Sequence, residues 1–448
     1  MACEKQRLAE AGTTMNHSPT SQTLCVIGLG YVGLTTAVGF AELGHKVIGV
    51  DVDDEKIKTL NRGISPIYEA GMEQLLRKNR DRLTFTVDLK EAVASSSIIF
   101  VAVGTPTKDT GEADLSQIID VAHGLSESIN NYKIIVIKST VPVGSVDLIR
   151  NIMSQKCKEG KDFDLVVNPE FLREGNAIHD FFNPSRVVIG ADNKQAAQVV
   201  AQLYKPLSTP VLVTSPIDAQ MIKYAANAFL ASRISFINEI ATISERVGAD
   251  IKNIIKGLSY DPRLGDGYLS PGIGFGGPCL TKDLKALIHM AQSYDYEPRF
   301  LKSILERNEE QIRSIVWKVK KALGGILYGK TIGVLGLAFK PGTKDIRNSP
   351  AVRIVKLLKQ GGALIKAYDP MAMDEAKIIL PDIEYCTTPY EFKNLDLLLL
   401  LVGWEEFKQL DYQRLKGGMS TPIIIDGANL LEPKVMKELG FTYSGVGR

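Results

Sequence analysis

The sequence has few cysteines, little net charge and no long apolar run. Its five cysteines lie far apart, at positions 3, 25, 157, 279 and 386. This excludes a complete disulfide framework and offers no zinc-binding spacing. A formal net charge of +2 argues against a nucleic-acid partner. The longest apolar run, residues 397–402, is too short to cross a membrane, so we expect no membrane partner and a buried strand there.

The first 22 residues are polar and lack the apolar core of a signal peptide. We expect a flexible N-terminal tail and a cytoplasmic protein. The remaining chain is too long for one ordinary domain and predicts two or three. Hydrophobic residues make up 45% of the chain and charged residues 23%, which is the balance of a globular protein.

A glycine motif follows the first predicted strand, residues 24–27. It reads Gly28-Leu29-Gly30-Tyr31-Val32-Gly33, and a small apolar helix (34–43) and a second strand (46–50) come after it. In a βαβ unit the first glycine allows a tight turn, the second admits a pyrophosphate and the third lets helix and strand pack closely. The helix N-terminus then offers free N–H groups to the phosphates. The pattern predicts a dinucleotide site, although a purely structural turn is the alternative.

The second strand ends in Asp51, where a carboxylate binds the adenosine ribose in such units. Asp53, Asp54 and Glu55 follow at once, and Lys56 is the only nearby positive charge. So many carboxylates would repel a 2′-phosphate. The sequence therefore predicts NAD rather than NADP.

Three further strands run into loops rich in hydroxyl groups, proline, glycine or carboxylates. The strands are predicted at 98–103, 134–138 and 165–167, and the loops at 104–107, 139–144 and 168–175. The carboxyl ends of parallel strands line the ligand crevice of an open sheet. Any one loop could be a simple turn, but three at one edge predict a site.

The central part of the chain has helical periodicity over 218–247, with apolar positions such as Met221, Phe229 and Ile237. Lys223 and Asn227 lie four residues apart and share a helix face. A solvated pair is one explanation; the small apolar residues around them favour a packed neighbourhood. A second long helix is predicted at about 298–323.

Between these helices lies an unusual loop, residues 272–283, in which four glycines and a proline surround Cys279. Glycine lets the backbone come close to a ligand. An ordinary turn with a small apolar cysteine is the alternative. We expect Lys282, or the end of a following helix, to lower the pKa of Cys279.

An α/β pattern then restarts, with strands predicted at 331–335, 363–368, 397–402 and 423–425 and a helix from Ser349-Pro350 to residue 360. Only Gly336 remains of the glycine motif, so a second NAD site is not expected. The predicted fold class is α/β, with two Rossmann-like doubly wound domains joined by a long central helix and a helical dimerisation region. The predicted parts are a tail (1–22), an NAD-binding domain (23–215), a central helical domain with the cysteine loop (216–325) and a C-terminal domain that binds the nucleotide sugar (326–448).

A dinucleotide site beside a cysteine, a lysine and two glutamates indicates a particular chemistry. Oxidation of an alcohol needs no thiol, whereas oxidation of an aldehyde to an acid does, because hydride leaves readily only from a tetrahedral adduct. A cysteine makes that adduct and the resulting thioester must be hydrolysed. Lysine and asparagine can stabilise an oxyanion, and a carboxylate can activate water.

With these residues assembled, the chain resembles the UDP-glucose/GDP-mannose dehydrogenase family. The matching segments occur in family order from about residue 24 to the C-terminus: 28–33, 105–107, 139–144, 168–175, 223–229, 274–279 with Lys282-Asp283, and 336–340. The resemblance implies a four-electron oxidation of a nucleotide sugar at C6 with reduction of two NAD. UDP-glucose to UDP-glucuronate, a step toward polysaccharide biosynthesis, is the conversion it favours. The same chemistry on a UDP-N-acetylhexosamine or GDP-mannose, a two-electron β-hydroxyacid-type dehydrogenase and a non-catalytic NAD-binding protein are the alternatives.

The resemblance also implies roles for individual residues. Cys279 would be the nucleophile, Lys223 and Asn227 the oxyanion partners, Asp283 and Thr140 the holders of the catalytic water, and Glu170 the acid/base in thioester hydrolysis. Cofactor binding would involve Gly28, Gly30, Tyr31, Val32, Gly33, Asp51, Lys56, Thr105, Pro106, Thr140, Glu174 and Arg347. Substrate binding would involve Phe171, Leu172, Arg173, Lys223, Asn227, Arg263, Tyr268, Gly276 and Lys340. No metal is implied.

Arg263 matches an arginine that in the family crosses to the partner subunit, which implies a homodimer or a higher homo-oligomer built on the 218–247 helix. Three positions depart from the family pattern. Pro278 and Thr281 replace residues common beside the cysteine, and the segment 426–429 lacks an arginine that many UDP-glucose members carry. These departures bear on sugar preference.

Overall fold

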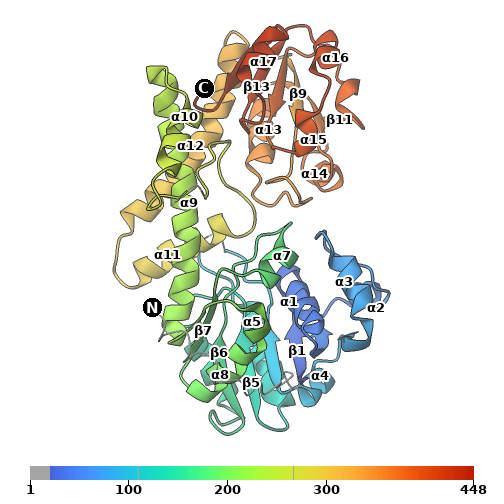
Figure 1. Cartoon of the computed structure of the whole chain (residues 1–448), viewed down its shortest axis with the longest axis vertical. Coiled ribbons are helices and arrows are strands. Elements are labelled where there is room, and N and C mark those ends of the chain that lie inside the picture. Colours follow the sequence, from blue (N-terminus) through green and yellow to red (C-terminus); the bar gives the residue numbers. More distant parts are fainter. Residues whose placement is uncertain (1–20, 109, 266) are drawn as a thin grey trace, which may run out of the picture.

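The computed structural model describes residues 21–108, 110–265 and 267–448. Most of the predicted N-terminal tail, with Cys3, lies outside the described residues. The chain forms two α/β units connected by long helices (Figure 1). In Figure 1 the N-terminal unit, blue to green, lies below the C-terminal unit, orange to red, and α9 runs between them. The predicted fold class of two Rossmann-like units is confirmed.

The N-terminal unit contains an eight-stranded sheet in the order β3-β2-β1-β4-β5-β6-β7-β8. All neighbouring strands are parallel except β6 and β7. The chain order reverses between β1 and β4, and in open α/β sheets such a switch point opens the ligand crevice. The strands are β1 (Thr23–Ile27), β2 (Lys46–Val50), β3 (Leu83–Thr86), β4 (Ile98–Val101), β5 (Lys133–Ile137), β6 (Phe163–Val167), β7 (Val187–Ala191) and β8 (Val211–Thr214).

Helices cover this sheet and bury its two faces in separate apolar clusters. β1 is buried almost throughout, and Cys25 within it has the packing role expected of a small apolar residue. The antiparallel β7 and the edge strand β8 were not predicted. The helices are α1 (Tyr31–Glu42), α2 (Asp54–Asn61), α3 (Met72–Lys78), α4 (Leu89–Ser95), α5 (Ser116–Ser128), α6 (Ser145–Met153), α7 (Ala177–Phe182) and α8 (Lys194–Leu203).

The central part consists of α9 (Pro216–Val247), α10 (Ile251–Ser259), α11 (Leu280–Ser293) and α12 (Arg299–Ala322). Ser215 caps α9 with its side chain and Gly248 ends it in a left-handed conformation. Lys223 and Asn227 are buried on α9, as expected of a packed neighbourhood. Met221 and Phe229 are exposed, unlike Ile237. The apolar positions of the predicted helix are therefore divided between the exposed and the buried sides of α9.

The C-terminal unit has a six-stranded parallel sheet in the order β11-β10-β9-β12-β13-β14. Its switch point lies between β9 and β12. Ser349 caps α13 and the next residue, Pro350, begins it, as predicted. The elements are β9 (Thr331–Leu335), α13 (Pro350–Gln360), β10 (Leu364–Tyr368), α14 (Met373–Ile379), β11 (Glu384–Tyr385), β12 (Leu397–Leu400), α15 (Glu405–Lys408), α16 (Tyr412–Gly417), β13 (Ile423–Asp426), α17 (Pro433–Glu438) and β14 (Thr442–Gly445).

Within the described part of the chain, none of the helices combines the length and apolar character needed to span a bilayer.

Candidate active site

The glycine motif forms the turn between β1 and α1. Gly28 has φ +88°, and a Cβ on Gly33 would lie 1.7 Å from the carbonyl oxygen of Gly28. Neither position tolerates a side chain, whereas a Cβ on Gly30 would meet nothing within 4 Å. The middle glycine therefore faces open space where the motif expects a pyrophosphate.

The N-terminus of α1 points its backbone N–H groups at the same space. Its N-cap, Gly30, makes no side-chain capping bond, and no acidic residue stands in the first turn. Tyr31 and Val32 are the first two residues of this helix. Free N–H groups with a positive helix dipole suit an anionic phosphate.

Asp51 follows β2 and lies at the edge of this crevice. Its carboxylate accepts hydrogen bonds from the backbone N–H of Leu29 and of Asp53, at 2.8 and 3.1 Å. Lys56 lies 2.8 Å from the same carboxylate. Although partial burial opposes ionisation, these bonds lower the pKa of Asp51. A carboxylate at a strand end can accept hydrogen bonds from the ribose hydroxyls, and the glycine turn beside it leaves room for the pyrophosphate. The residues present therefore fit NAD.

Thr105 and Thr140 connect the ends of β4 and β5. The Thr105 hydroxyl donates to the carbonyl of Thr140 at 2.8 Å, and Lys282 Nζ donates to the Thr105 hydroxyl at 3.4 Å. Pro106 follows Thr105 in the same loop. The contact of Lys282 joins the sheet edge to the first turn of α11. It brings the predicted cofactor crevice and the cysteine loop together.

Lys223 and Glu170 form a buried ion pair. Lys223 Nζ lies 3.0 Å from Glu170 Oε1, and the backbone N–H of Leu172 donates to Glu170 Oε2 at 2.6 Å. Burial would lower the pKa of Lys223, but the negative charges of Glu170 and Asp283 outweigh it, and the pKa is raised. Lys223 is therefore an ammonium ion at neutral pH.

Asp283 is almost fully buried and lies between two donors. Asn227 Nδ2 donates to Asp283 Oδ2 at 2.5 Å, and Lys282 Nζ lies 2.7 Å from Asp283 Oδ1. Because Lys223 and Asn227 share a face of α9, this pair lies beside the Lys223–Glu170 pair. Two predicted residues from α9 thus hold one carboxylate each.

Cys279 is the N-cap residue of α11 and is exposed to the cleft. The surrounding protein still removes enough water to raise the pKa of its thiol to about 11, and the neighbouring Glu170 and Asp283 charges add to this. Lys223 and Lys282 act in the opposite direction but do not prevail. Lys282 therefore acts in the predicted direction, but the expectation of a lowered pKa for Cys279 is wrong because burial outweighs it.

Amide side chains from the long helices brace the cysteine loop. Asn308 of α12 accepts from the N–H of Phe275 at 2.8 Å and donates to its carbonyl at 3.0 Å. Gln311 donates to the carbonyl of Gly272 at 2.6 Å, and Asn238 of α9 accepts from its N–H at 2.8 Å. These side-chain amides thus bond to backbone N–H and carbonyl groups of the loop, as a neighbouring strand would in a sheet. None of these amides was predicted, although polar residues on a buried helix face were a visible signal.

The glycines after Phe275 pack against the C-terminal unit. A Cβ on Gly276 would lie 2.4 Å from the carbonyl oxygen of Asn348, and one on Gly277 would lie 2.6 Å from the Phe339 ring. The lack of a side chain at Gly276 therefore lets the cysteine loop approach the backbone that precedes α13.

Glu174 reaches across the cleft to the C-terminal unit. The Thr343 hydroxyl donates to its Oε1 at 2.7 Å, and Arg347, which also pairs with Asp345, lies 3.9 Å from its Oε2. Burial and the charge of Asp345 raise the pKa of Glu174, whereas burial lowers the pKa of Lys340. These charged residues meet where both units face the cleft.

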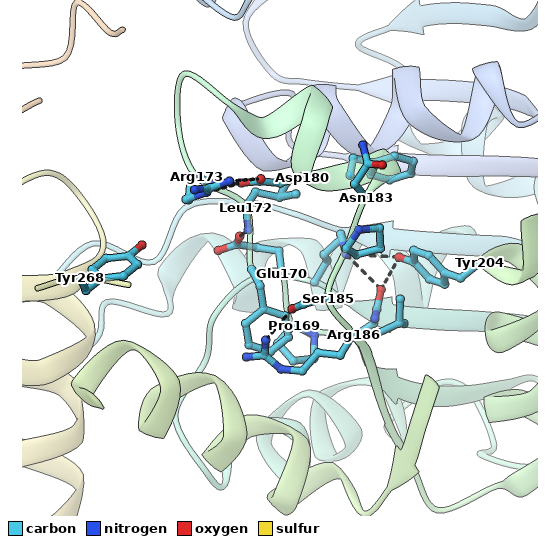
Figure 2. Close-up of a pocket in the computed structure, with 16 residues that line it drawn as sticks. Pro169, Glu170, Leu172, Arg173, Asp180, Asn183, Ser185, Arg186, Tyr204 and Tyr268 are labelled. Atoms are coloured by element: carbon cyan, nitrogen blue, oxygen red, sulfur yellow. Dashed lines mark hydrogen bonds and ion pairs between the residues drawn. The ribbon is translucent and has the colours of Figure 1, made fainter. Parts of the chain in front are cut away.

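A cavity of about 280 Å³ lies beside Glu170 (Figure 2). Phe171, Leu172, Arg173 and Tyr268 line it, so the structure brings these predicted substrate residues together. In Figure 2 the Glu170 carboxylate points toward the side on which Tyr268 lies. Arg173 makes an ion pair with Asp180 at 2.6 Å across the mouth.

Arg263 is not part of this cluster. Its guanidinium pairs with Asp261 in its own loop at 2.6 Å and is 86% exposed.

Glu69 is a further residue that the sequence did not single out. Its buried carboxylate accepts from the N–H groups of Gly175 and Ala177, at 2.9 and 2.6 Å. It therefore fixes the loop that carries Glu174 and begins α7. Among the described residues, no group of histidine, cysteine, aspartate and glutamate side chains is arranged to hold a metal ion.

Comparisons with known proteins cover nearly the whole chain. Models of the UDP-glucose/GDP-mannose dehydrogenase family match in sequence: its NAD binding domain over residues 22–208, its central domain over 218–310 and its UDP binding domain over 333–433. The UDP-glucose 6-dehydrogenase TuaD of Bacillus subtilis is 47% identical over 95% of this chain and 93% of its own. The UDP-glucose 6-dehydrogenase of Rhizobium meliloti is 41% identical over 95% of this chain and 99% of its own.

Two solved structures are similar over the same length. A UDP-glucose dehydrogenase from Pyrobaculum islandicum has a TM-score of 0.89 and 38% identity, covering 95% of this chain and 98% of its own. A UDP-D-ManNAc dehydrogenase from Pyrococcus horikoshii has a TM-score of 0.83 and 27% identity, covering 95% and 99%.

Proposed function

Because the chain belongs to the UDP-glucose/GDP-mannose dehydrogenase family, we propose that it oxidises C6 of UDP-glucose to the carboxylate of UDP-glucuronate with NAD. The observation that carries the proposal is the cluster of Cys279, Lys223, Glu170 and Asp283 beside a crevice that fits NAD. In this reaction the alcohol, two NAD⁺ and one water give a carboxylate, two NADH and three protons. We assign NAD binding to residues 23–215, the central helical part to 216–325 and nucleotide-sugar binding to 326–448.

NAD, when bound, supplies the hydride acceptor, and each of the two NAD molecules would accept one hydride from C6. NAD would be bound by the glycine turn (28–33), by Asp51 with Lys56, and by residues 105–106 and Thr140 at the strand ends. Glu174 and Arg347 would contact it from the other side of the cleft. The carboxylates at 53–55 leave little place for a 2′-phosphate, which favours NAD over NADP.

Cys279 is our candidate for the nucleophile that traps the aldehyde formed by the first oxidation. Its sulfur would bond to C6 while the thiol proton passes to a nearby base, giving a thiohemiacetal. Loss of the second hydride and of the hydroxyl proton then gives a thioester on Cys279. Since the pKa of the free thiol is about 11, the thiol attacks with transfer of its proton rather than as a preformed thiolate.

Lys223 and Asn227 would stabilise negative charge on the C6 oxygen. Both come from one face of a long, well-packed helix, so their positions do not depend on a flexible loop. A buried ammonium and an amide N–H are strong donors in a site that excludes water.

Thioester hydrolysis needs an activated water. Glu170 would take the proton from that water, and Asp283 with Thr140 would position it. The water oxygen bonds to C6, the acyl–sulfur bond breaks, and the proton passes from Glu170 to the sulfur. The acid so formed loses its own proton and leaves as the carboxylate.

The substrate would lie across the cleft between the two units. Phe171, Leu172 and Arg173 lie at the cavity beside Glu170 with Tyr268, and we add Gly276 of the cysteine loop and Lys340 of the C-terminal unit as substrate contacts. The curated relatives named above are UDP-glucose enzymes, which favours UDP-glucose over a UDP-N-acetylhexosamine or GDP-mannose.

A homodimer built on α9 is also part of the proposal. Phe229 and Phe236 on this helix are 62% and 53% exposed, and Ile243 and Val247 continue the same stripe. Such a stripe at helical spacing is typical of a subunit contact. A dimer would give the exposed Arg263 a place in the partner's cleft. We assign the enzyme to the cytosol, which fits its free cysteines.

The test is to supply a panel of nucleotide sugars and count NADH per sugar consumed. We expect two NADH per UDP-glucose from the wild-type protein. Cys279→Ser should make an adduct or aldehyde and stop short of the carboxylate, with turnover reduced at least about a thousandfold. One NADH per sugar, or full turnover by Cys279→Ser, would contradict the mechanism.

A further inference from the structure

Lys138 is a second buried lysine beside the catalytic cluster, and none of the roles above uses it. It follows β5, directly before Ser139 and Thr140, and is 5% exposed. Its Nζ donates to Asn168 Oδ1 at 3.1 Å and to the Tyr204 hydroxyl at 3.3 Å. Both acceptors are neutral. Tyr204 and its hydrogen bonds appear in Figure 2.

Such an ammonium ion is costly to bury. A charge taken out of water without a hydrogen-bonded counterion loses free energy that neutral acceptors replace only in part. Accordingly, burial lowers the pKa of Lys138 to about 8, although the charge of Glu170 opposes the effect. Tyr204 and Asn168 bond to each other at 2.6 Å without its help. A purely structural role therefore explains this lysine poorly.

Its position relates it to Glu170. Asn168, which holds Lys138, is two residues before Glu170, and all three line the cavity beside the loop. The interaction of Lys138 with the Glu170 charge is favourable and that with Lys223 is unfavourable. Lys138 therefore shares one carboxylate with the catalytic lysine.

The other charged groups at this cavity are accounted for. Asp180 of α7 pairs with Arg173. Arg186, before β7, stacks on the Phe171 ring at 3.9 Å. Asp283 binds Asn227 and Lys282. Glu170, although paired with Lys223, is therefore the carboxylate whose charge also acts on Lys138.

We propose that Lys138 is a positioning residue for the hydrolytic step, supplying a second positive charge behind Glu170. This inference rests on the proposed function. In the resting cluster, Lys223 neutralises Glu170. When Lys223 turns its hydrogen bonds to the C6 oxygen of the substrate, Glu170 loses part of that support. Asn168 and Tyr204 hold the Lys138 ammonium group in place, so its charge stays near Glu170 and keeps the carboxylate ionised to accept a proton from water.

The experiment compares the pH dependence of kcat in the wild type, Lys138→Met and Lys138→Gln. The variants remove the charge, and Gln keeps an N–H donor. We expect the acid limb of the profile to move to higher pH by about one unit in both variants, the size of effect that one nearby charge produces. Lys138→Arg, which keeps the charge, should leave the limb in place.

Lys133→Met is the matched control. Lys133 begins the same strand, is equally buried at 1% exposed, and donates to the carbonyls of Ser96 and Ala94, at 2.6 and 3.3 Å. It lies at the sheet edge opposite the catalytic cluster. Its loss should leave the acid limb unmoved.

A lower rate with an unmoved acid limb in both charge-removing variants would overturn the proposal, as would failure of both to fold. An equal shift in Lys133→Met would overturn it too. The wild-type count of NADH per UDP-glucose separately tests the proposed function. If another nucleotide sugar proves to be the substrate, the same variants are compared on that sugar, because the inference concerns only the difference between profiles.

Discussion

At the scale of single residues, the cleft holds two buried lysines with opposite surroundings. Lys223 faces a carboxylate at 3.0 Å and its pKa is raised, whereas Lys138 has neutral partners and its pKa is lowered to about 8. The first ion is stabilised by its partner. The second is retained at a cost to stability, as is common where a charge serves function.

That cost can be measured in Lys138→Met. Below pH 8 the lysine is protonated in both states, and the full cost of burying its charge is present. Between pH 8 and 10.5, the ordinary pKa of lysine, the unfolded chain holds a proton that the folded protein has released, so wild-type stability rises with pH. At pH 7 we expect the free energy of unfolding of the variant to exceed that of the wild type by about 1–3 kcal/mol.

Urea unfolding at pH 7 and pH 10 tests this, and the advantage of the variant should largely disappear at pH 10. A variant that is less stable than the wild type by the same amount at both pH values would contradict the expected cost.

At the scale of elements, the cysteine loop depends on helices that are distant in sequence. Asn308 satisfies both the N–H and the carbonyl of Phe275. Four residues later Cys279 begins α11. The loop is therefore rigid despite its glycines, because amides of α9 and α12 replace the hydrogen bonds that a sheet would give.

Asn308→Ala should loosen this loop without touching the reacting groups. Two buried backbone groups would lose their partners, at about 1–3 kcal/mol. Displacement of the thiol should lower kcat by roughly ten- to a hundredfold. Chemical unfolding and NADH release measure the two effects. Glu306→Ala, at an exposed position of the same helix, is the control, and equal losses in both variants would contradict a specific role.

The sequence predicted those elements whose signal is local. Consecutive residues suffice to predict the glycine turn at 28–33, the strand at 46–50 and the Ser349-Pro350 cap. The structure contains all three. β7 and β8 were missed, because neither ends in a loop with recognisable chemistry. Periodicity marked Met221 and Phe229 as apolar positions of a helix, but it does not show whether such positions are buried. The pKa of Cys279 was misjudged because burial and the nearby Glu170 depend on the folded cleft.

At the scale of the whole molecule, the candidate site needs both units and the central helices. Lys223 comes from α9, Glu170 from the N-terminal sheet and Lys340 from the C-terminal unit, and α9 spans the distance between the units (Figure 1). The residue types were readable in sequence. Their pairing as Lys223–Glu170 and Asn227–Asp283 was not, because each pair joins segments more than fifty residues apart.

The proposed subunit contact is also a property of the whole molecule. Phe236→Glu would place a carboxylate in the exposed stripe of α9, and we expect the dimer to dissociate into monomers. These monomers should lose most of their activity because the partner's Arg263 no longer reaches the site. Light scattering after gel filtration measures the mass. Val87→Glu is the control: Val87 lies in the N-terminal unit and is 50% exposed. This variant should remain dimeric. A monomeric wild type would contradict the proposed dimer.

The close approach of Gly276 and Gly277 to Asn348 and Phe339 bears on how such enzymes can be recombined. The reactive loop belongs to the central part of the chain, but its shape is complementary to the backbone of the C-terminal unit. A chimera that joins the first part of this chain to a relative's nucleotide-sugar unit at residue 326 would separate the two surfaces. Exchange of sugar preference between relatives should therefore succeed when residues 272–278 are transferred together with 339–350, and fail when either is transferred alone.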